Sequence, residues 1–263
     1  MTFWEHLDEL RGVLIRSLVA VVVMTIIAFT FKRILFDYIV LAPKESDFIT
    51  YQLLCKLGKF LSISSLCFDT GSIHLINISL AGQFTSHITI SFIAGCIVSS
   101  PYIVWEFWRF IKPGLTEEEK KNTTGVVFII SSLFITGVLF SYFLVVPVMV
   151  NFLGTYQVSE SVINQIALDS YVGSVSMMTL LMGLIFEFPI VVFFLTKVGI
   201  LNPSVLKKYR KHTIVIILIV AGIITPSPDV FSQLVVSVPL YILYEMSLQI
   251  SSKVYKKRAL PEE

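Results

Sequence analysis

The sequence predicts an all-α, polytopic membrane protein: a single curved bundle of six transmembrane helices over residues 1–263, with both termini cytoplasmic and short fifth and sixth spans. Three observations predict this fold. First, 55% of the residues are hydrophobic, 14% are charged and the mean hydropathy is +0.83, which is more apolar surface than one soluble core hides. Second, several apolar runs approach the roughly 20 residues that span a bilayer. Third, Lys and Arg are distributed unevenly between alternate loops.

The apolar runs set the bounds of the expected spans. They cover 13–31, 87–110, 125–150, 171–195, 213–224 and 230–244. These runs are continuous, which excludes the alternating strands of a β-barrel. The fifth run makes only about 18 Å of helix, against a hydrocarbon core of about 30 Å. Two explanations remain open for the short runs: the bilayer thins locally, or polar flanks lengthen the helices and neighbours cover them.

Basic residues predict the orientation, because cytoplasmic segments carry the excess of Lys and Arg. They follow the second and fourth expected spans and the last one: Arg109, Lys112, Lys120, Lys121, Lys197, Lys207, Lys208, Arg210, Lys211, Lys253, Lys256, Lys257 and Arg258. Segments 151–170 and 225–229 contain no Lys or Arg. Both termini are therefore expected in the cytoplasm. The formal net charge of only +2, without a large basic block, argues against a nucleic-acid partner.

The long loop over residues 32–86 is expected to fold as a periplasmic cap on the bundle, since it is too long for a simple turn. It contains Cys55 and Cys67. An oxidising periplasm permits a disulfide between them, and two reduced, packed thiols are the alternative. The spacing of the cysteines matches no metal site, so neither a metal nor a cofactor is expected.

The N-terminal segment carries the first candidate site. Thr2–Glu5 has the form of a capping box, so a helix is expected to begin at once, run along the membrane surface and enter the first span. Carboxylates bind guanidinium groups through paired, charge-assisted hydrogen bonds, so Glu9 and Glu119 together predict a site for a cationic peptide. A solvated helix charge is the alternative for Glu9. Thr116 with Glu119 also matches a capping box, which is the alternative for Glu119.

Polar groups within the later spans are the second set of candidates. Glu187 stands among apolar neighbours eight residues from the cytoplasmic end of its span, so it is expected to be protonated, hydrogen-bonded or in a wet concavity. Pro189 should kink the same helix. Asp229 is placed to cap the sixth span, and Gln233 to hydrogen-bond across helices. A purely structural hydrogen bond for Glu187 and simple capping for Asp229 are the alternatives.

Several motifs, in order along the chain, resemble the core multispanning subunit of the bacterial twin-arginine protein translocase. The first motif is His6–Arg11. The second runs from Ser100 to Trp108 and continues with Phe110 and Pro113–Leu115. The third and fourth are Phe186–Pro189 and Thr225–Gln233. The last is the most specific. The likeness covers nearly the whole chain, and the loop 32–86 is its least similar part.

This resemblance implies a receptor in the bacterial inner membrane that binds the paired arginines of signal peptides on folded cargo. It also implies recruitment of small single-span subunits (TatA/TatB type), a homo-oligomer within the complex, and export driven by the proton-motive force. The implied roles are signal-peptide binding by Glu9, Arg11 and Glu119, partner contacts at Glu187 and Gln233, and outer-side roles for Phe84 and Asp229. Because Glu117 and Glu118 precede Glu119 directly, it stays open which of the three carboxylates contacts the ligand.

Three other classes of protein compete with this interpretation. An ion-coupled solute transporter would also carry a midspan carboxylate, but it usually has an internal repeat, and none is visible in the sequence. An intramembrane enzyme would need a second midspan carboxylate, a His or a Ser-Lys set to act with Glu187. The sequence shows none of these, so no reaction is expected. Only the expected pair of Glu9 and Glu119 argues against a purely structural scaffold.

Overall fold

A computed structural model of the chain describes residues 3–62, 67, 73–112, 123–159, 164–225 and 230–259. Within these residues the bundle is built from α1 (Phe3–Thr30), α3 (Gly82–Ile111), α5 (Thr123–Phe140), α6 (Val146–Thr155), α7 (Leu168–Phe186), α8 (Phe188–Val198), α9 (Pro203–Ile224) and α10 (Val230–Ala259). Five stretches of the described chain are long and apolar enough to cross a membrane: Trp4–Thr30, Gly82–Ile111, Gly125–Thr155, Leu168–Val198 and Ser232–Lys256.

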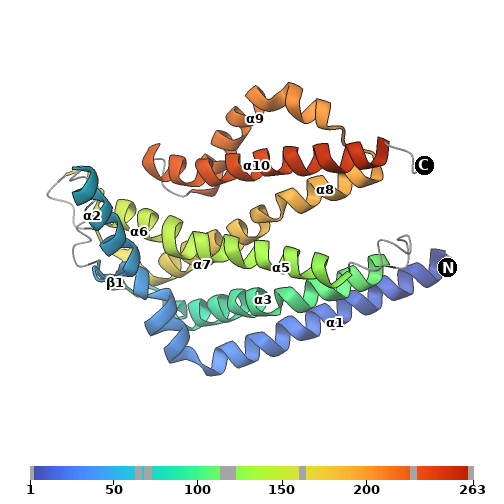
Figure 1. Cartoon of the computed structure of the whole chain (residues 1–263). Helices are drawn as coiled ribbons and strands as arrows, with labels where there is room; N and C mark the ends of the chain where they lie inside the picture. The colour runs from blue at the N-terminus through green and yellow to red at the C-terminus, as the bar shows by residue number, and fades with distance from the viewer. Residues whose placement is uncertain are drawn as a thin grey trace.

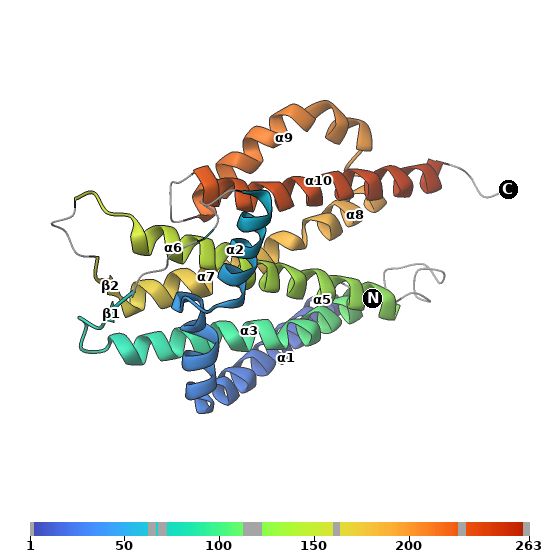
Figure 2. The ribbon, with the colours of Figure 1, turned by 60° about the vertical axis from the view of Figure 1, so that its left-hand side comes forward.

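The bundle is layered (Figures 1 and 2). α1 packs along α3 at one edge, α5 and α7 lie in the middle, and α8, α10 and α9 form the other edge. The first residues of α1 and the last residues of α10 lie at the same end of the bundle, which we name the terminal end. The opposite end, the cap end, carries the chain between α1 and α3 and the start of α7 (Figure 1).

The cap end is a folded unit, as the length of loop 32–86 predicts. It contains a π-helical segment η1 (Ile34–Val40), a 3₁₀ turn η2 (Ala42–Lys44), helix α2 (Ile49–Leu61) and strand β1 (Leu75–Ile76). β1 pairs in parallel with β2 (Ile166–Ala167), which immediately precedes α7. The cap is therefore joined to the bundle by a sheet as well as by its chain ends.

Small residues allow close helix contacts in two layers of the bundle. A Cβ atom on Gly95 of α3 would lie 2.8 Å from the backbone nitrogen of Thr25 in α1. A Cβ atom on Gly137 of α5 would lie 2.7 Å from the carbonyl oxygen of Met182 in α7. Because lipid gives apolar helices little hydrophobic reason to associate, such backbone approach supplies the van der Waals contact that holds them together.

The fourth expected span is broken at Glu187, which ends α7 and precedes α8. Pro189 lies in the first turn of α8, where it has no amide hydrogen to continue the ladder of the preceding helix. The predicted kink is therefore confirmed. The third expected span also changes path: a π-helical turn, η5 (Ser141–Val145), separates α5 from α6 just before Pro147.

The prediction of a short sixth span is wrong. α10 has 30 residues, and its apolar stretch Ser232–Lys256 is long enough to cross a membrane. The helix continues past the expected end at 244 through Glu245, whose carboxylate lies 2.6 Å from the Arg210 guanidinium of α9. α9 has 22 residues although its apolar part begins only at Thr213. Residues 203–212 therefore extend this helix beyond the apolar run, but α9 is not among the five stretches named above, and both explanations for the short run stay open.

The start of α1 differs from the expected surface segment. The helix begins at Phe3, in agreement with the capping box, and runs unbroken to Thr30. No bend separates the residues around Glu9 from the apolar stretch. Glu9 is consequently fixed to the same rigid helix that packs along α3.

Candidate functional site

Glu9 lies in the second turn of α1, at the terminal end, and its side chain is half-buried. Within the described residues it has no ion-pair or hydrogen-bond partner. The start of α1 is held against the end of α3 because the His6 ring stacks on Phe110, with centroids 4.3 Å apart. Glu9 is thus a carboxylate on a fixed backbone with open acceptor positions. Arg11, two residues further on, is exposed.

A buried charge cluster lies deeper along the same pair of helices. The Nε atom of Arg16 on α1 donates to Oε2 of Glu106 on α3 at 2.8 Å. The hydroxyl of Tyr102, one turn before Glu106, donates to Oε1 at 3.0 Å. Glu106 is only 1% exposed, whereas the Arg16 side chain is 45% exposed. Both carboxylate oxygens are therefore satisfied, and Arg16 covers the carboxylate on its open side.

Sequence reasoning missed Glu106, although a signal was present. Glu106 stands between Trp105 and Trp108, which favoured an interface anchor as the explanation for that whole stretch. Arg16 lies inside the first apolar run, where an unpaired charge is costly. Two opposite charges inside two apolar runs predict a pair, and a search for the partner of Arg16 would have found Glu106.

The aromatic residues near the end of α3 have two different environments. Trp105 is 45% exposed, and the Arg109 guanidinium lies over its ring, 5.8 Å from the centroid. Trp108 is buried and packs against Phe194 of α8. Trp105 with Arg109 has the aromatic and basic character of an interface anchor, whereas Trp108 belongs to the helix packing.

Glu117, Glu118 and Glu119 lie outside the described residues, so the expected pairing of Glu9 with Glu119 stays a prediction. The chain that carries them joins α3, which ends at Ile111, to α5, which begins at Thr123. Both of these helix ends lie at the terminal end, where Glu9 also lies (Figure 1).

Glu187 occupies the break between α7 and α8 and is half-buried. Neither of its carboxylate oxygens has a hydrogen-bond partner within the described chain. A buried, unpaired carboxylate in an apolar layer is costly, and such groups in membrane helices usually serve a contact or a pathway. The simple structural alternative, a hydrogen bond inside the bundle, stays open because the Phe134 backbone of α5 interacts with Glu187.

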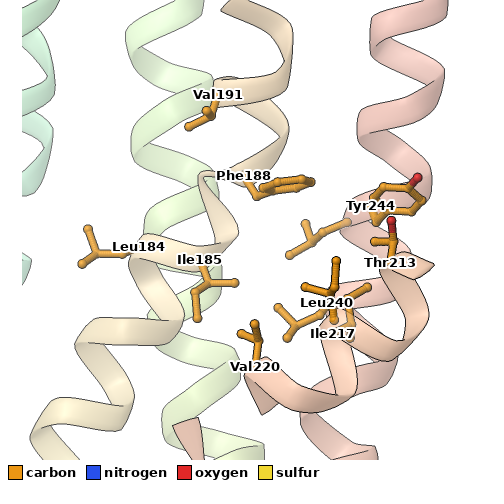
Figure 3. A pocket seen from close by; sticks show the side chains of 11 residues that line it. Leu184, Ile185, Phe188, Val191, Thr213, Ile217, Val220, Leu240 and Tyr244 are labelled. Atoms are coloured by element: carbon orange, nitrogen blue, oxygen red, sulfur yellow. The ribbon is translucent and has the colours of Figure 1, made fainter. Parts of the chain in front are cut away.

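An apolar groove lies between α7 and α8 on one side and α9 and α10 on the other (Figure 3), and Glu187 is not among the residues that line it. Its cavity has a volume of about 350 Å³. The side chains that line it include Leu184, Ile185, Phe188, Val191, Thr213, Ile217, Val220, Leu240 and Tyr244. Its polar groups are already satisfied, because the Thr213 hydroxyl bonds to the Tyr209 carbonyl and the Tyr244 hydroxyl to the Leu206 carbonyl. The groove therefore offers an apolar surface to an apolar helix or to lipid.

Gln233 bonds between helices, as the sequence suggested. Its Nε2 atom on α10 donates to the Leu218 carbonyl oxygen on α9 at 2.9 Å. Gly222 leaves room for this amide, since a Cβ atom there would lie 3.2 Å from Nε2. Gln233 thus fixes α10 to α9 near the cap end.

The cap end holds the remaining candidates. Phe84 in the first turn of α3 is exposed. It lines a cavity of about 590 Å³, and Lys32, Arg33 and His87 also line this cavity. Cys55 and Cys67 are joined by a disulfide. Asp229 lies outside the described residues, so its role stays a prediction.

These features define a class of protein: a polytopic helical membrane protein with a free carboxylate at its terminal end and no metal-binding cluster of His, Cys, Asp or Glu among the described residues. The chain belongs to the family of the Sec-independent protein translocase protein (TatC), which matches residues 5–239. It is therefore a component of a protein translocase, which is a transport protein and not a catalyst.

Similar proteins cover the whole chain. The chain is 44% identical over 260 residues to the Sec-independent protein translocase protein TatC of Blattabacterium sp. subsp. Periplaneta americana, with 98% of this chain and 97% of that protein covered. It is 36% identical to the protein of the same name from Deinococcus radiodurans, with 99% and 88% covered. A crystal structure described as twin-arginine translocase receptor TatC in DDM matches with a TM-score of 0.71 and 32% identity, over 94% of this chain and 99% of that one.

Proposed function

We propose that this chain is the receptor and core subunit of the twin-arginine translocation system. It binds the twin-arginine signal peptides of folded proteins at the terminal end, where Glu9 and Glu119 accept the guanidinium groups and Arg11 supports the surface. It then recruits single-span partners of the TatA/TatB type for export driven by the proton-motive force. The similar crystal structure described as a twin-arginine translocase receptor supports this assignment.

The Glu9 carboxylate, which has no partner among the described residues, is the observation that carries the proposal. The neighbouring carboxylate of Glu106 is occupied by Arg16, whereas Glu9 has no partner among the described residues. A ligand with two adjacent guanidinium groups fits a site with two carboxylates, because each pair forms parallel charge-assisted hydrogen bonds. Glu119 supplies the second carboxylate in this proposal.

The proposed topology is one bundle over residues 1–263 with six membrane spans in the bacterial inner membrane, α9 being the additional span. The terminal end is cytoplasmic, because the start of α1 and the end of α10 lie there together with the exposed cations Lys207, Lys208 and Lys211 of α9. The cap end is then periplasmic, which suits the disulfide between Cys55 and Cys67. Phe84 and Asp229 act on this outer side.

Partner helices are assigned to the groove beside Glu187. Ile185 and Phe188, which flank that residue, both line the groove. Glu187 and Gln233 do not line the groove, so in this proposal the polar groups of the partner helix contact them at its margins. The chain acts in this complex as one of several copies.

Site-specific crosslinking tests the receptor role. A photoreactive residue is placed at 9 or 119, and a twin-arginine signal peptide is compared with its twin-lysine version in native membranes. Crosslinks that depend on the arginine pair are expected at both positions. Charge reversal by Glu9→Lys or Glu119→Lys should abolish binding and leave the protein inserted. Asp8→Lys, on an exposed neighbouring position of α1, is the matched control. Unaltered cargo export in both charge-reversed variants would reject the assigned roles.

The partner role is tested separately. Glu187→Ala should leave signal-peptide binding largely intact and weaken co-purification of the single-span subunits. Glu187→Gln, which keeps the shape and hydrogen-bonding capacity of the side chain, is expected to retain more of this assembly. If the partners co-purify with Glu187→Ala as they do with the unaltered chain, the assignment of Glu187 is wrong.

A further inference from the structure

Arg16 points toward Glu9 along α1. The two residues are seven positions apart, which is two helical turns, so they project from the same face about 10.5 Å apart along the axis. Helical side chains lean toward the N-terminus, and Arg16 does so here: its Nη1 atom lies 3.2 Å from the place where a Cβ atom on Gly12 would stand. Gly12 is one turn before Arg16 and three residues after Glu9, about 4.5 Å along the axis.

No side chain stands at Gly12 to separate the guanidinium from Glu9. An arginine with 45% exposure keeps considerable freedom to move when its partner is removed. An ion pair between Arg16 and Glu9 would occupy the carboxylate with a guanidinium from the same helix. Such an internal pair would compete directly with any guanidinium that arrives on a ligand.

Glu106 prevents this competition in the structure. Its carboxylate is 1% exposed and receives Nε of Arg16 at 2.8 Å. Tyr102 orients the same carboxylate through its hydroxyl, at 3.0 Å. A buried carboxylate requires a compensating cation, so the contact with Glu106 is a stronger hold on Arg16 than an exposed contact with Glu9 would be.

We infer that Glu106 is a positioning residue that holds Arg16 away from Glu9 and so keeps Glu9 free for the guanidinium groups of the ligand. This inference rests on the proposed function, because it concerns the affinity of the Glu9 site for a twin-arginine peptide. Tyr102 and Gly12 belong to the same arrangement: Tyr102 fixes the carboxylate, and Gly12 gives the Arg16 guanidinium its place on α1.

The test measures binding of a labelled twin-arginine signal peptide to the full chain in membranes, for Glu106→Gln, Arg16→Gln and the double variant. Glu106→Gln frees Arg16 and should weaken binding roughly three- to fivefold, the upper part of the range for one exposed ion pair. Arg16→Gln removes the competitor and should leave affinity within about twofold of the unaltered chain. The double variant should also return to within about twofold. Membrane accumulation and thermal unfolding of each variant report on folding.

A merely structural ion pair predicts a different pattern. Loss of either partner would then weaken binding equally, and the double variant would stay weak because α1 and α3 had lost their link. Either result overturns the inference. If Glu106→Gln does not accumulate, the double variant decides alone, since it leaves no buried charge: a folded double variant that fails to bind peptide contradicts the inference.

Glu9→Gln is measured in parallel to separate the two levels of the account. If Glu9→Gln binds peptide normally, the proposed receptor site is wrong. If Glu9→Gln loses binding but Glu106→Gln does not, only the positioning role of Glu106 is wrong.

Discussion

At the cap end, neutral hydroxyls donate to backbone carbonyls, whereas at the terminal end charged side chains pair between helices. The single proton of the Tyr51 hydroxyl is shared between the Pro43 carbonyl oxygen at 2.8 Å and the Pro147 carbonyl oxygen at 3.0 Å. Tyr171 reaches the Val40 carbonyl at 2.9 Å, and Tyr142 the Ile39 carbonyl at 2.8 Å. Among the described residues of the cap, the ion pairs Arg33 with Asp37 and Lys44 with Glu45 join residues close in sequence and do not link distant elements.

Toward the terminal end, long-range contacts include ion pairs besides neutral bonds such as that between Thr196 and Ser251. Arg16 pairs with Glu106 across 90 residues of sequence, and Arg210 with Glu245 across 35. A neutral hydrogen bond does not respond to a charged ligand or to salt, but a partly exposed ion pair does. The difference predicts that the ion pairs of the terminal end are more sensitive to salt than the hydroxyl contacts of the cap.

Removal of the disulfide should have the largest effect on the cap. Cys55→Ser with Cys67→Ser opens a loop with a sequence separation of 12 residues, and closure of a loop of this size contributes roughly 2–3 kcal/mol. Thermal unfolding in detergent should detect this loss, and Cys96→Ser, a free cysteine, is the control. Signal-peptide binding should not change. A parallel loss of peptide binding would show that the two ends are coupled.

Loss of the Tyr51 hydroxyl should have an intermediate effect. Tyr51→Phe removes two hydrogen bonds and leaves two carbonyls with fewer donors, at a cost of about 1–2 kcal/mol in the free energy of unfolding. The loss should be the same at low and high salt, because the contacts are neutral. Tyr38→Phe, on an exposed tyrosine of η1, should change little. A strong salt dependence of the Tyr51→Phe effect would contradict the neutral character assigned to the cap.

The pair of Arg210 with Glu245 should give the smallest effect, since the Arg210 side chain is half exposed. Arg210→Gln is expected to lower the unfolding temperature less than Tyr51→Phe does. The difference should vanish near 1 M salt, where the screening length falls to about 3 Å. Lys211→Gln, its exposed neighbour, is the matched control. An Arg210→Gln loss that persists at high salt would mean that packing, and not charge, joins α9 to α10.

Much of the fold could be predicted because each long apolar run in the sequence indicates a membrane helix. The kink at Pro189 was predictable, since proline breaks a helix locally. The length of α10 was not, because Glu245 ends the apolar run and its partner Arg210 is found only in three dimensions. The tyrosine contacts of the cap were hidden for the same reason: Tyr51 and Pro147 meet across 96 residues.

The candidate site was predictable in part. Glu9 follows from charge at the start of a span and from the resemblance to the translocase subunit. Glu106 was missed because the adjacent tryptophans explained its segment well enough, and periodicity does not reveal that Arg16 lies opposite. Local patterns identify a carboxylate, but only the packing of α1 on α3 decides which carboxylate is occupied and which is free.

The most direct measurement of the central claim is a double-mutant cycle between Glu9 and the ligand. Affinities of twin-arginine and twin-lysine peptides are measured for the unaltered chain and for Glu9→Gln. If Glu9 accepts a guanidinium, the preference for arginine should fall by roughly tenfold in Glu9→Gln, a coupling of about 1.4 kcal/mol. If the ratio of the affinities for the two peptides is the same in Glu9→Gln as in the unaltered chain, Glu9 does not bind the arginine pair.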